Sequence, residues 1–346
     1  MRDTGRMPAI QAGRRQRQSP FFATCPAGLA RILRDQLAGL PGIEITGSGS
    51  DGQRDYILFA ADRDGRALAL ASRLADGVFA DAGRFSRAGT TDPNVLATRS
   101  WQADSVQRAL SVWAEQVRPL SASMSYSVTT SVHTGPRELH SGIRRALTQV
   151  VGQDRPRWKP AARAELEIWL AEWRDGELVT GLRLGGNRRE RAGGSAFSPA
   201  FAAGMVYLAG PADGLLLDPC CGTGAVLAEA AAAGWAAAGT DSSADLLDQA
   251  RAAAPGADVS LGDAREILEP DDSVAACVSR LPPAASDGGW LGSALAEMSR
   301  VTRSDGAVIL LAPEIPRTVL PGALRLRRQI PVRLADGQQV WVFRRR

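Results

Sequence analysis

Lysine, histidine and closely spaced cysteines are scarce in this sequence, and their scarcity argues against some kinds of site. Lys159 is the sole lysine, so nearly all of the 41 basic residues are arginines. The only histidines are His133 and His140, and no cysteines are spaced as CxxC, so a zinc site is not indicated. The adjacent Cys220 and Cys221 have diverging side chains. We expect all four cysteines to be reduced thiols, as is usual in the cytoplasm.

Long apolar runs are also lacking. No stretch approaches the roughly 20 apolar residues that cross a bilayer, and the N-terminus has no signal-peptide core. We therefore expect a cytoplasmic protein without a membrane partner. The 346 residues are 45% hydrophobic and 23% charged, which is enough for two or three globular domains. The formal net charge of +4 is compatible with nucleic-acid binding without demonstrating it.

The chain begins with a basic tail and a small module of mixed pattern. Residues 1–18 hold five arginines among Gly, Pro, Gln and Ser, a composition that cannot bury a core and predicts a flexible arm. Residues 19–92 predict a small α/β module. Its expected elements are strands over 21–24 and 55–60, a helix that starts near Pro26, and a helix over 67–80.

Residues 93–185 predict a second α/β block. The expected elements are a strand over 126–132, a helix over 137–151, and a hairpin of strands over 164–171 and 178–184 around the turn Asp175-Gly176. In the first hairpin strand, Leu166, Ile168 and Leu170 should point inward. Along the helix, basic residues fall largely on the face opposite the apolar one. They are Arg137, Arg144 and Arg145.

A connector over 186–198 precedes the third region. It is rich in glycine and has the composition of a hinge, and three of its arginines make it basic: Arg188, Arg189 and Arg191. From residue 199 to 346, apolar strands alternate with helices, which predicts a parallel sheet with right-handed crossovers. The expected strands are 215–218, 236–241, 258–262, 275–281 and 307–311, and the expected helices are 199–208, 223–233, 244–254, a short one near residue 265, and 290–301.

The last two apolar runs, 324–333 and 339–345, are joined by the turn Asp336-Gly337. Two strands joined by a two-residue turn must be antiparallel, so the final strand should run against the parallel direction.

The stretch Asp218-Pro-Cys-Cys-Gly-Thr-Gly224 follows the first strand of this region and leads into a helix. A glycine turn at that place exposes backbone N–H groups and the positive end of a helix to a ligand. Asp241 ends the next strand, where it is suitably placed to accept hydrogen bonds from ribose hydroxyls. Asp263 ends the third, where it can bond an adenine amine. Acids at three strand ends suit a positively charged nucleoside ligand with an amine.

These residues resemble a known family. The third region is similar to a class I S-adenosylmethionine-dependent methyltransferase, with a Rossmann-like sheet whose last strand is antiparallel. The segment Asp218–Ala231 resembles the DPxCGSGTxxxEAA form of RNA guanine-N2 methyltransferases. Phe21–Leu29 resembles the ferredoxin-like module that precedes a THUMP domain in those enzymes, and residues 93–185 are similar to THUMP, an RNA-binding module.

The resemblance implies a cofactor, a substrate and a set of site residues. The cofactor is S-adenosylmethionine, and the substrate is RNA, in this family a tRNA guanosine methylated at N2. The implied cofactor-binding residues are Asp218, Pro219, Cys220, Gly222, Thr223, Gly224, Asp241, Ser242, Asp263 and Ala264. The arginines named above are the candidate RNA-binding residues. Two structural alternatives stay open: Asp218 can cap the adjacent helix, and Asp263 can cap a turn at Arg265.

The sequence departs from the family at the catalytic motif, an Asn/Asp-x-Pro-aromatic run after the fourth strand. The corresponding residues are Ser279, Arg280, Pro282 and Pro283. Arg280 stands where the amide is expected and cannot accept a hydrogen bond from an amine, and Pro283 offers no π-face for a base. Ser279 can supply an oxygen if the register differs by one. Trp290 can stack on the base, although we favour a role in anchoring its helix to the core.

Three functions therefore stay open at this point. We favour an RNA methyltransferase that acts on a tRNA guanosine. The alternative is a non-catalytic RNA-binding protein with a vestigial methyltransferase fold, which Arg280 and Pro283 motivate. The third is an amine methyltransferase that acts on a small molecule or on DNA, whose activity would survive deletion of residues 1–185.

Overall fold

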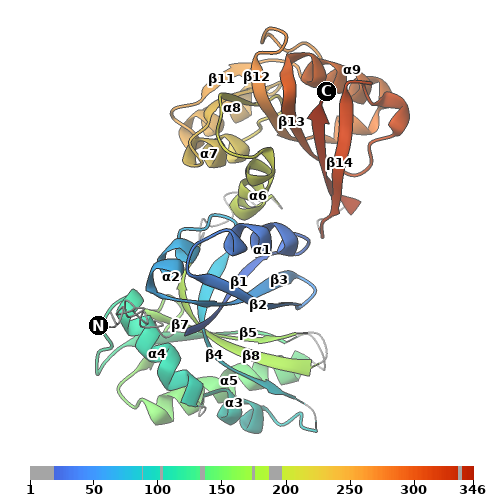
Figure 1. Ribbon diagram of the computed structural model, residues 1–346. Helices are drawn as coiled ribbons and strands as arrows, with labels where there is room; N and C mark the ends of the chain where they lie inside the picture. The colour runs from blue at the N-terminus through green and yellow to red at the C-terminus, as the bar shows by residue number, and fades with distance from the viewer. Residues whose placement is uncertain are drawn as a thin grey trace, which may run out of the picture.

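The structure is a computed structural model of the whole chain. It describes residues 19–87, 89–101, 104–132, 137–173, 176–186, 197–333 and 337–346. The predicted basic arm lies outside these residues, as does most of the predicted hinge. The chain forms two lobes, joined through helix α6 (Pro199–Ala209), which lies between them (Figure 1).

The N-terminal lobe is built on one eight-stranded sheet with the strand order β2-β3-β1-β4-β8-β7-β5-β6. Its strands are β1 (Ser19–Pro26), β2 (Ile43–Ser50), β3 (Arg54–Ala61), β4 (Gly77–Ser86), β5 (Ser125–Ser131), β6 (Lys159–Pro160), β7 (Leu166–Glu172) and β8 (Glu177–Gly185). Its helices are α1 (Ala30–Ala38), α2 (Arg63–Leu70), α3 (Pro93–Trp101), α4 (Asp104–Gln116) and α5 (Arg137–Asp154). The antiparallel pair β4–β8 joins the strands of residues 19–92 to those of residues 93–185.

This sheet curls so that strands distant in the strand order meet across an aromatic layer. The rings of Tyr56 on β3 and Trp173, just after β7, lie 5.2 Å apart between centroids. A Cβ on Gly49 of β2 would lie 2.6 Å from the Trp173 ring, so only glycine fits there. Trp169 is buried in the same layer. As predicted, Leu166 and Ile168 on β7 are also buried, on the opposite face, so both faces of this strand are covered.

The C-terminal lobe contains a seven-stranded sheet with the order β11-β10-β9-β12-β13-β15-β14. Its strands are β9 (Leu215–Asp218), β10 (Ala236–Asp241), β11 (Asp258–Leu261), β12 (Val274–Arg280), β13 (Thr302–Ala312), β14 (Leu324–Pro331) and β15 (Gln339–Arg345), and its other α-helices are α7 (Ala225–Ala232), α8 (Ala244–Ala253) and α9 (Gly288–Val301). The first five strands are parallel, whereas β15 runs antiparallel to both β13 and β14. The predicted antiparallel last strand is confirmed.

Two expected helices are wrong. The helix expected over 67–80 is α2, which ends at Leu70, followed by β4 from Gly77 onward. Strand pairing overrides the helical pattern because Val78 and Phe79 pair with β1 on one side and β8 on the other. Near Arg265 the chain forms an isolated bridge between Asp263 and Glu266 in place of a helix.

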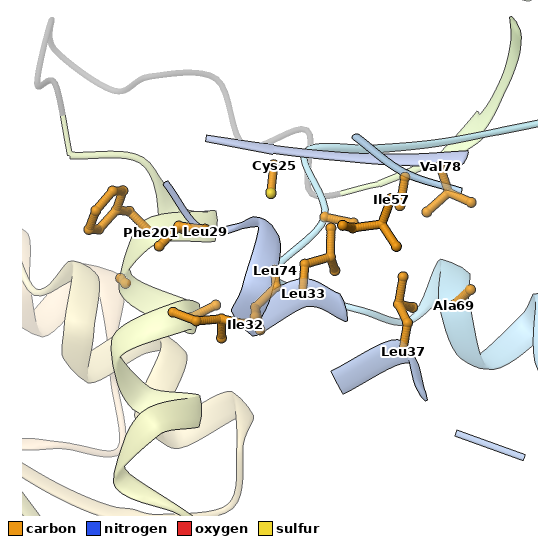
Figure 2. Packing of buried hydrophobic residues seen from close by; sticks show 14 of the residues in the cluster. Cys25, Leu29, Ile32, Leu33, Leu37, Ile57, Ala69, Leu74, Val78 and Phe201 are labelled. Atoms are coloured by element: carbon orange, nitrogen blue, oxygen red, sulfur yellow. The ribbon is translucent and has the colours of Figure 1, made fainter. Parts of the chain in front are cut away.

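The two lobes share apolar packing and ion pairs, of which the pair at Glu229 has a buried carboxylate and the pair between Arg328 and Asp35, at 3.9 Å, is exposed. Leu29 and Ile32 at the start of α1 lie beside Phe201 of α6, and all three are buried in one cluster (Figure 2). Arg73 of the N-terminal lobe binds the Glu229 carboxylate on α7 through two hydrogen bonds of 2.5 and 2.8 Å. Glu229 is buried. Within the described ranges we find no helix whose length and apolar composition suit a membrane crossing.

Candidate functional site

A cavity of about 920 Å³ opens at the carboxyl edge of the parallel strands in the C-terminal lobe. Asp218 at the end of β9, Asp241 at the end of β10 and Arg280 at the end of β12 all line it. Glu314, two residues after β13, also lines it. Phe197 and Pro199, at the start of the helix α6 that lies between the lobes, also contribute to the cavity wall. Carboxyl ends of parallel strands are where open α/β sheets bind ligands.

The glycine turn between β9 and α7 is held close to the neighbouring elements. Gly224 has a φ of 80° and begins α7 in the left-handed region. A Cβ there would lie 2.7 Å from Ala250 Cα on α8, so α7 and α8 approach each other at a place where only glycine fits. Gly222 also has a positive φ, of 52°, but a Cβ there would meet no atom within 4 Å. The turn therefore needs Gly224 for packing and leaves open space beside Gly222.

Asp241 fastens this turn to the end of β10. Its Oδ2 accepts a hydrogen bond of 2.8 Å from the Gly222 N–H, and its Oδ1 accepts one of 2.9 Å from the Ser243 N–H. Each carboxylate oxygen has a further lone pair, so Asp241 can still accept hydrogen bonds from a ligand. A cavity wall that combines this acceptor with an open glycine turn fits the ribose of a nucleoside cofactor.

Asp218 is a fully buried acid with local hydrogen-bond donors. The Ser279 hydroxyl donates a 2.7 Å bond to Asp218 Oδ1, and the Cys220 N–H donates one of 3.2 Å to the same oxygen. Burial raises the pKa of Asp218 to about 7, the two hydrogen bonds oppose that rise, and the Asp241 carboxylate adds to it. A cationic ligand group would favour the ionised form of Asp218. The acid therefore titrates near neutral pH beside the cavity.

The thiols around the cavity are unsuited to nucleophilic chemistry. Burial raises the pKa of Cys221 to about 12 and that of Cys220 still higher, with the Asp218 carboxylate adding to both. Since the thiolate is the reactive form, these residues remain thiols at neutral pH. The described residues contain no group of three or more His, Cys, Asp or Glu side chains placed to hold a metal.

The structure brings part of the predicted cofactor set together. The cavity is lined by Asp218, Cys220, Gly222, Thr223 and Asp241, and its lining does not include Pro219, Gly224, Ser242, Asp263 or Ala264. Asp263 accepts hydrogen bonds from the backbone N–H and the guanidinium of Arg265, the latter at 2.6 Å. This geometry matches the turn-capping alternative, and the contact of Asp263 with adenine stays a prediction.

The predicted catalytic residues separate into two groups. Arg280, Pro282 and Pro283 line the cavity. Ser279 is fully buried and its hydroxyl donates to Asp218, so it does not offer its oxygen to a substrate. Trp290 on α9 is half-buried, packs against the core and does not line the cavity, in keeping with an anchoring role.

The predicted RNA-binding arginines are partly described. Arg144 and Arg145 are exposed on α5 and line a surface hollow of about 830 Å³ beside β5. Arg137 begins α5, but its side chain lies outside what the structure describes. The three remaining arginines, Arg188, Arg189 and Arg191, also fall outside the described residues.

The cavity lining also includes an aromatic ring and two acids that the sequence did not indicate: Phe197, Glu229 and Glu314. Phe197 precedes α6 by two residues, Glu229 lies on α7, and Glu314 follows β13. Glu229 could have been found, because it belongs to the quoted Asp218–Ala231 segment. For the other two the sequence offers no motif spacing, since each reaches the cavity only through the fold.

The comparisons with known proteins agree with this geometry. A family model described as a methyltransferase domain matches residues 216–306, from β9 into β13. The crystal structure of TrmN from Thermus thermophilus is similar over 94% of this chain and 99% of its own, with a TM-score of 0.71 and 20% sequence identity. A possible methylase from Clostridium difficile 630 is similar over 95% of this chain and 98% of its own, with a TM-score of 0.67 and 14% identity. A search of curated proteins finds no match.

At these identities the structural likeness establishes a shared fold across both lobes. The predicted fold class, an α/β chain with a Rossmann-like sheet whose last strand is antiparallel, is confirmed.

Proposed function

Because the chain carries a class I S-adenosylmethionine-dependent methyltransferase domain, we propose that it methylates RNA, and specifically a tRNA guanosine at N2. The observation that carries this proposal is one continuous cavity that extends from the glycine turn and Asp241 to Arg280 and Glu314. At about 920 Å³, it is at the upper end of the range of ligand pockets and has room for a nucleoside cofactor together with a nucleobase.

The cofactor half of the cavity lies over the ends of β9 and β10. S-adenosylmethionine supplies an electrophilic methyl group when bound. Asp241 accepts hydrogen bonds from the ribose hydroxyls, and the backbone around Gly222 contacts the methionine portion. Asp218 places a titratable negative charge next to the cationic parts of the cofactor. Asp263 binds Arg265 and does not line this cavity, and its contact with the adenine amine stays a prediction.

The RNA half of the proposal rests on the N-terminal lobe. Residues 19–92 and 93–185 resemble a ferredoxin-like module and a THUMP module, and we propose that they form the RNA-binding part of the protein. The exposed Arg144 and Arg145 on α5 are suited to phosphate contacts because arginine carries a permanent charge and a forked donor. The full-length likeness to TrmN supports the same arrangement of lobes.

The alternative function is RNA binding without methyl transfer. It is favoured by one feature, the arginine and proline at positions where amine methyltransferases of the resembled family carry an amide and an aromatic residue. In that case the cavity still binds the cofactor, but no methyl group is transferred.

Incubation of the full chain with bulk tRNA and isotope-labelled S-adenosylmethionine, followed by nucleoside mass spectrometry, separates the two functions. We expect labelled N2-methylguanosine. Labelling of another nucleoside would reject guanosine N2 and retain RNA methylation. No labelled nucleoside, with tRNA binding intact, would favour the binding-only alternative.

Cofactor binding by calorimetry supplies the matched controls. Asp241→Ala removes the carboxylate that accepts hydrogen bonds from the ribose hydroxyls and from the Gly222 N–H. We therefore expect the affinity for S-adenosylmethionine to fall at least about tenfold. Asp258 is exposed at the N-terminal end of β11 and does not line the cavity. The Asp258→Ala variant should therefore bind S-adenosylmethionine with the affinity of the wild type. Unchanged binding by Asp241→Ala would contradict the assigned cofactor half.

A further inference from the structure

The part of the cavity over the ends of β12 and β13 combines an aromatic ring, a cation and a carboxylate. Arg280 ends β12 and lies opposite Leu311 of β13, and Glu314 follows three residues later on the neighbouring chain segment. The Arg280 guanidinium stands 5.7 Å from the centroid of the Phe197 ring. All three side chains line the cavity. We call Phe197, Arg280 and Glu314 the base-side triad.

Within the described part of the chain, no side chain neutralises either charged member of the triad. Among the described residues, no ion pair involves Arg280 or Glu314 within 4.0 Å. Both side chains are exposed to the open cavity. The Arg280 guanidinium carbon lies 5.7 Å from the Phe197 ring centroid, a cation–π contact that leaves the N–H groups of Arg280 without a carboxylate partner among the described residues. A donor and an acceptor are therefore both available to a ligand.

The triad supplies two chemical functions that residues 279–283 lack: a hydrogen-bond acceptor for an amine, and an aromatic face for a base. Arg280 offers no acceptor for an amine and Pro283 offers no π-face, but the Glu314 carboxylate is an acceptor and the Phe197 ring has a π-face. Glu314 comes from the segment after β13, and Phe197 comes from the segment before α6. The departure at Arg280 and Pro283 thus changes which residues carry these functions and does not remove the functions from the cavity.

We propose that the base-side triad is a nucleobase subsite selective for guanine; this deepens, and rests on, the proposed function. Guanine presents two donors, N1–H and the N2 amine, on one edge and two acceptors, O6 and N7, on another. The Glu314 carboxylate accepts from both donors, the Arg280 guanidinium donates to O6 and N7, and the base stacks against Phe197. Adenine has an acceptor lone pair at N1, which would face the Glu314 carboxylate and be repelled.

The test measures binding of nucleotides to the full chain saturated with S-adenosylhomocysteine, the demethylated cofactor. Equilibrium dialysis with guanosine, inosine and adenosine 5′-monophosphates isolates each contact, since inosine differs from guanosine only by the missing N2 amine. We expect the wild type to bind the guanosine nucleotide most tightly and the adenosine nucleotide most weakly. A wild type without this preference would overturn the proposal.

Two variants and one control assign the preference to residues. Glu314→Gln should weaken guanosine nucleotide binding about tenfold and reduce its advantage over inosine, because a charged acceptor is lost. Phe197→Leu should weaken all three nucleotides by a similar factor and leave their ratios unchanged. Glu44→Gln, an exposed carboxylate on β2, is the matched control and should behave as the wild type. Unchanged ratios in Glu314→Gln would overturn the assignment of Glu314.

These outcomes are separable from those of the proposed function. Guanine selectivity that depends on Glu314, without methylation of tRNA, would retain the subsite and reject methyl transfer. Methylation of guanosine in tRNA, with nucleotide ratios unaffected by Glu314→Gln, would retain the reaction and reject the subsite. Thermal unfolding and S-adenosylhomocysteine binding of each variant check that the fold and the cofactor half are intact.

Discussion

The carboxyl group of Asp218 joins the glycine turn to the end of β12 through hydrogen bonds. Ser279 donates to it from β12, and the Cys220 N–H donates to it from the turn. These two donors reduce the cost of burying the acid but do not remove it, since burial still raises the pKa of Asp218 to about 7. A serine that the sequence made a catalytic candidate therefore acts as a support for a neighbouring acid.

This acid predicts how stability depends on pH in the protein without cofactor. The folded-state pKa of Asp218, about 7, lies above the unfolded value of about 3.9. Its protonated form is therefore favoured by folding, and its contribution to stability is full below about pH 4 and is lost as the pH rises through 7. Asp218→Asn keeps an acceptor for Ser279 and does not titrate. We expect the stability of the wild type relative to this variant to fall between pH 5 and pH 8, measured by urea unfolding. A constant difference would contradict the raised pKa.

Cofactor affinity should change in the opposite direction over the same interval. The positively charged S-adenosylmethionine favours the ionised acid, so wild-type binding should tighten from pH 6 to pH 8 and release protons. Calorimetry in buffers of different ionisation enthalpy measures that release directly. The Asp218→Asn variant should show neither effect.

At single residues, the sequence predicted the acids that end strands better than the side chains that complete the cavity. Asp218 and Asp241 were found because each ends an apolar run beside a glycine turn, a local signal. Phe197 and Glu314 lie 117 positions apart by their residue numbers, and only the fold brings both to one cavity. Asp263 satisfied the same strand-end rule as Asp241 but pairs with Arg265, a local competition that spacing alone does not resolve.

At the level of elements, the two glycines of the turn have separate tasks. Gly224 packs against α8, where a Cβ would be 2.7 Å from Ala250 Cα, whereas Gly222 borders the open cavity. Both have positive φ, so any other residue is strained at either position. A substitution at Gly224 also forces α7 and α8 apart, while one at Gly222 extends into the part of the cavity that we propose for the cofactor.

Alanine substitutions should separate these tasks. Gly224→Ala should lower the free energy of unfolding by at least about 2 kcal/mol, the left-handed cost of a single residue plus overpacking. Gly222→Ala should lower the free energy of unfolding by about 1 kcal/mol, the cost of a left-handed backbone alone. It should weaken cofactor binding more than it weakens the fold. Gly256→Ala, in open space without a positive φ, is the control. Equal stability losses at Gly222 and Gly224 would contradict the packing role of Gly224.

Element prediction succeeded where periodicity and burial agree and failed where pairing partners decide. Strands such as β9 and β10 are short apolar runs between turn residues, so their bounds were predicted to the residue. The strand β2 was missed because its Gly- and Ser-rich sequence lacks a strong apolar pattern, and pairing with β3 fixes it. The start of β4 was taken for helix because nothing local reveals its partners, β1 and β8.

At the scale of the whole molecule, the cavity proposed for the cofactor and the N-terminal lobe are linked through Glu229. This residue lines the cavity, is buried in α7, and binds Arg73 of the other lobe with both carboxylate oxygens. The side chain of Glu229 is 1% exposed and that of Arg73 is 38% exposed. The hydrogen bond from Arg73 therefore serves mainly to satisfy a carboxylate that the fold has taken out of water. The lobes share more than this pair, because α6 packs against α1 in the same core cluster.

Removal of the Arg73 charge alone should therefore lower the free energy of unfolding more than removal of the Arg73 and Glu229 charges together. Arg73→Met leaves a buried, unpaired carboxylate, and we expect a loss of about 2 kcal/mol, less than the roughly 3–5 kcal/mol of a fully buried pair because Arg73 is part-exposed. The double variant Arg73→Met with Glu229→Leu removes the stranded charge and should recover most of that loss. Arg303→Met, which breaks the exposed pair with Asp213, should change stability by less than about 1 kcal/mol. Urea unfolding of the wild type and these three variants measures the loss and its recovery, and equal destabilisation by Arg73→Met and Arg303→Met would show that the Arg73–Glu229 pair is no stronger than a surface contact.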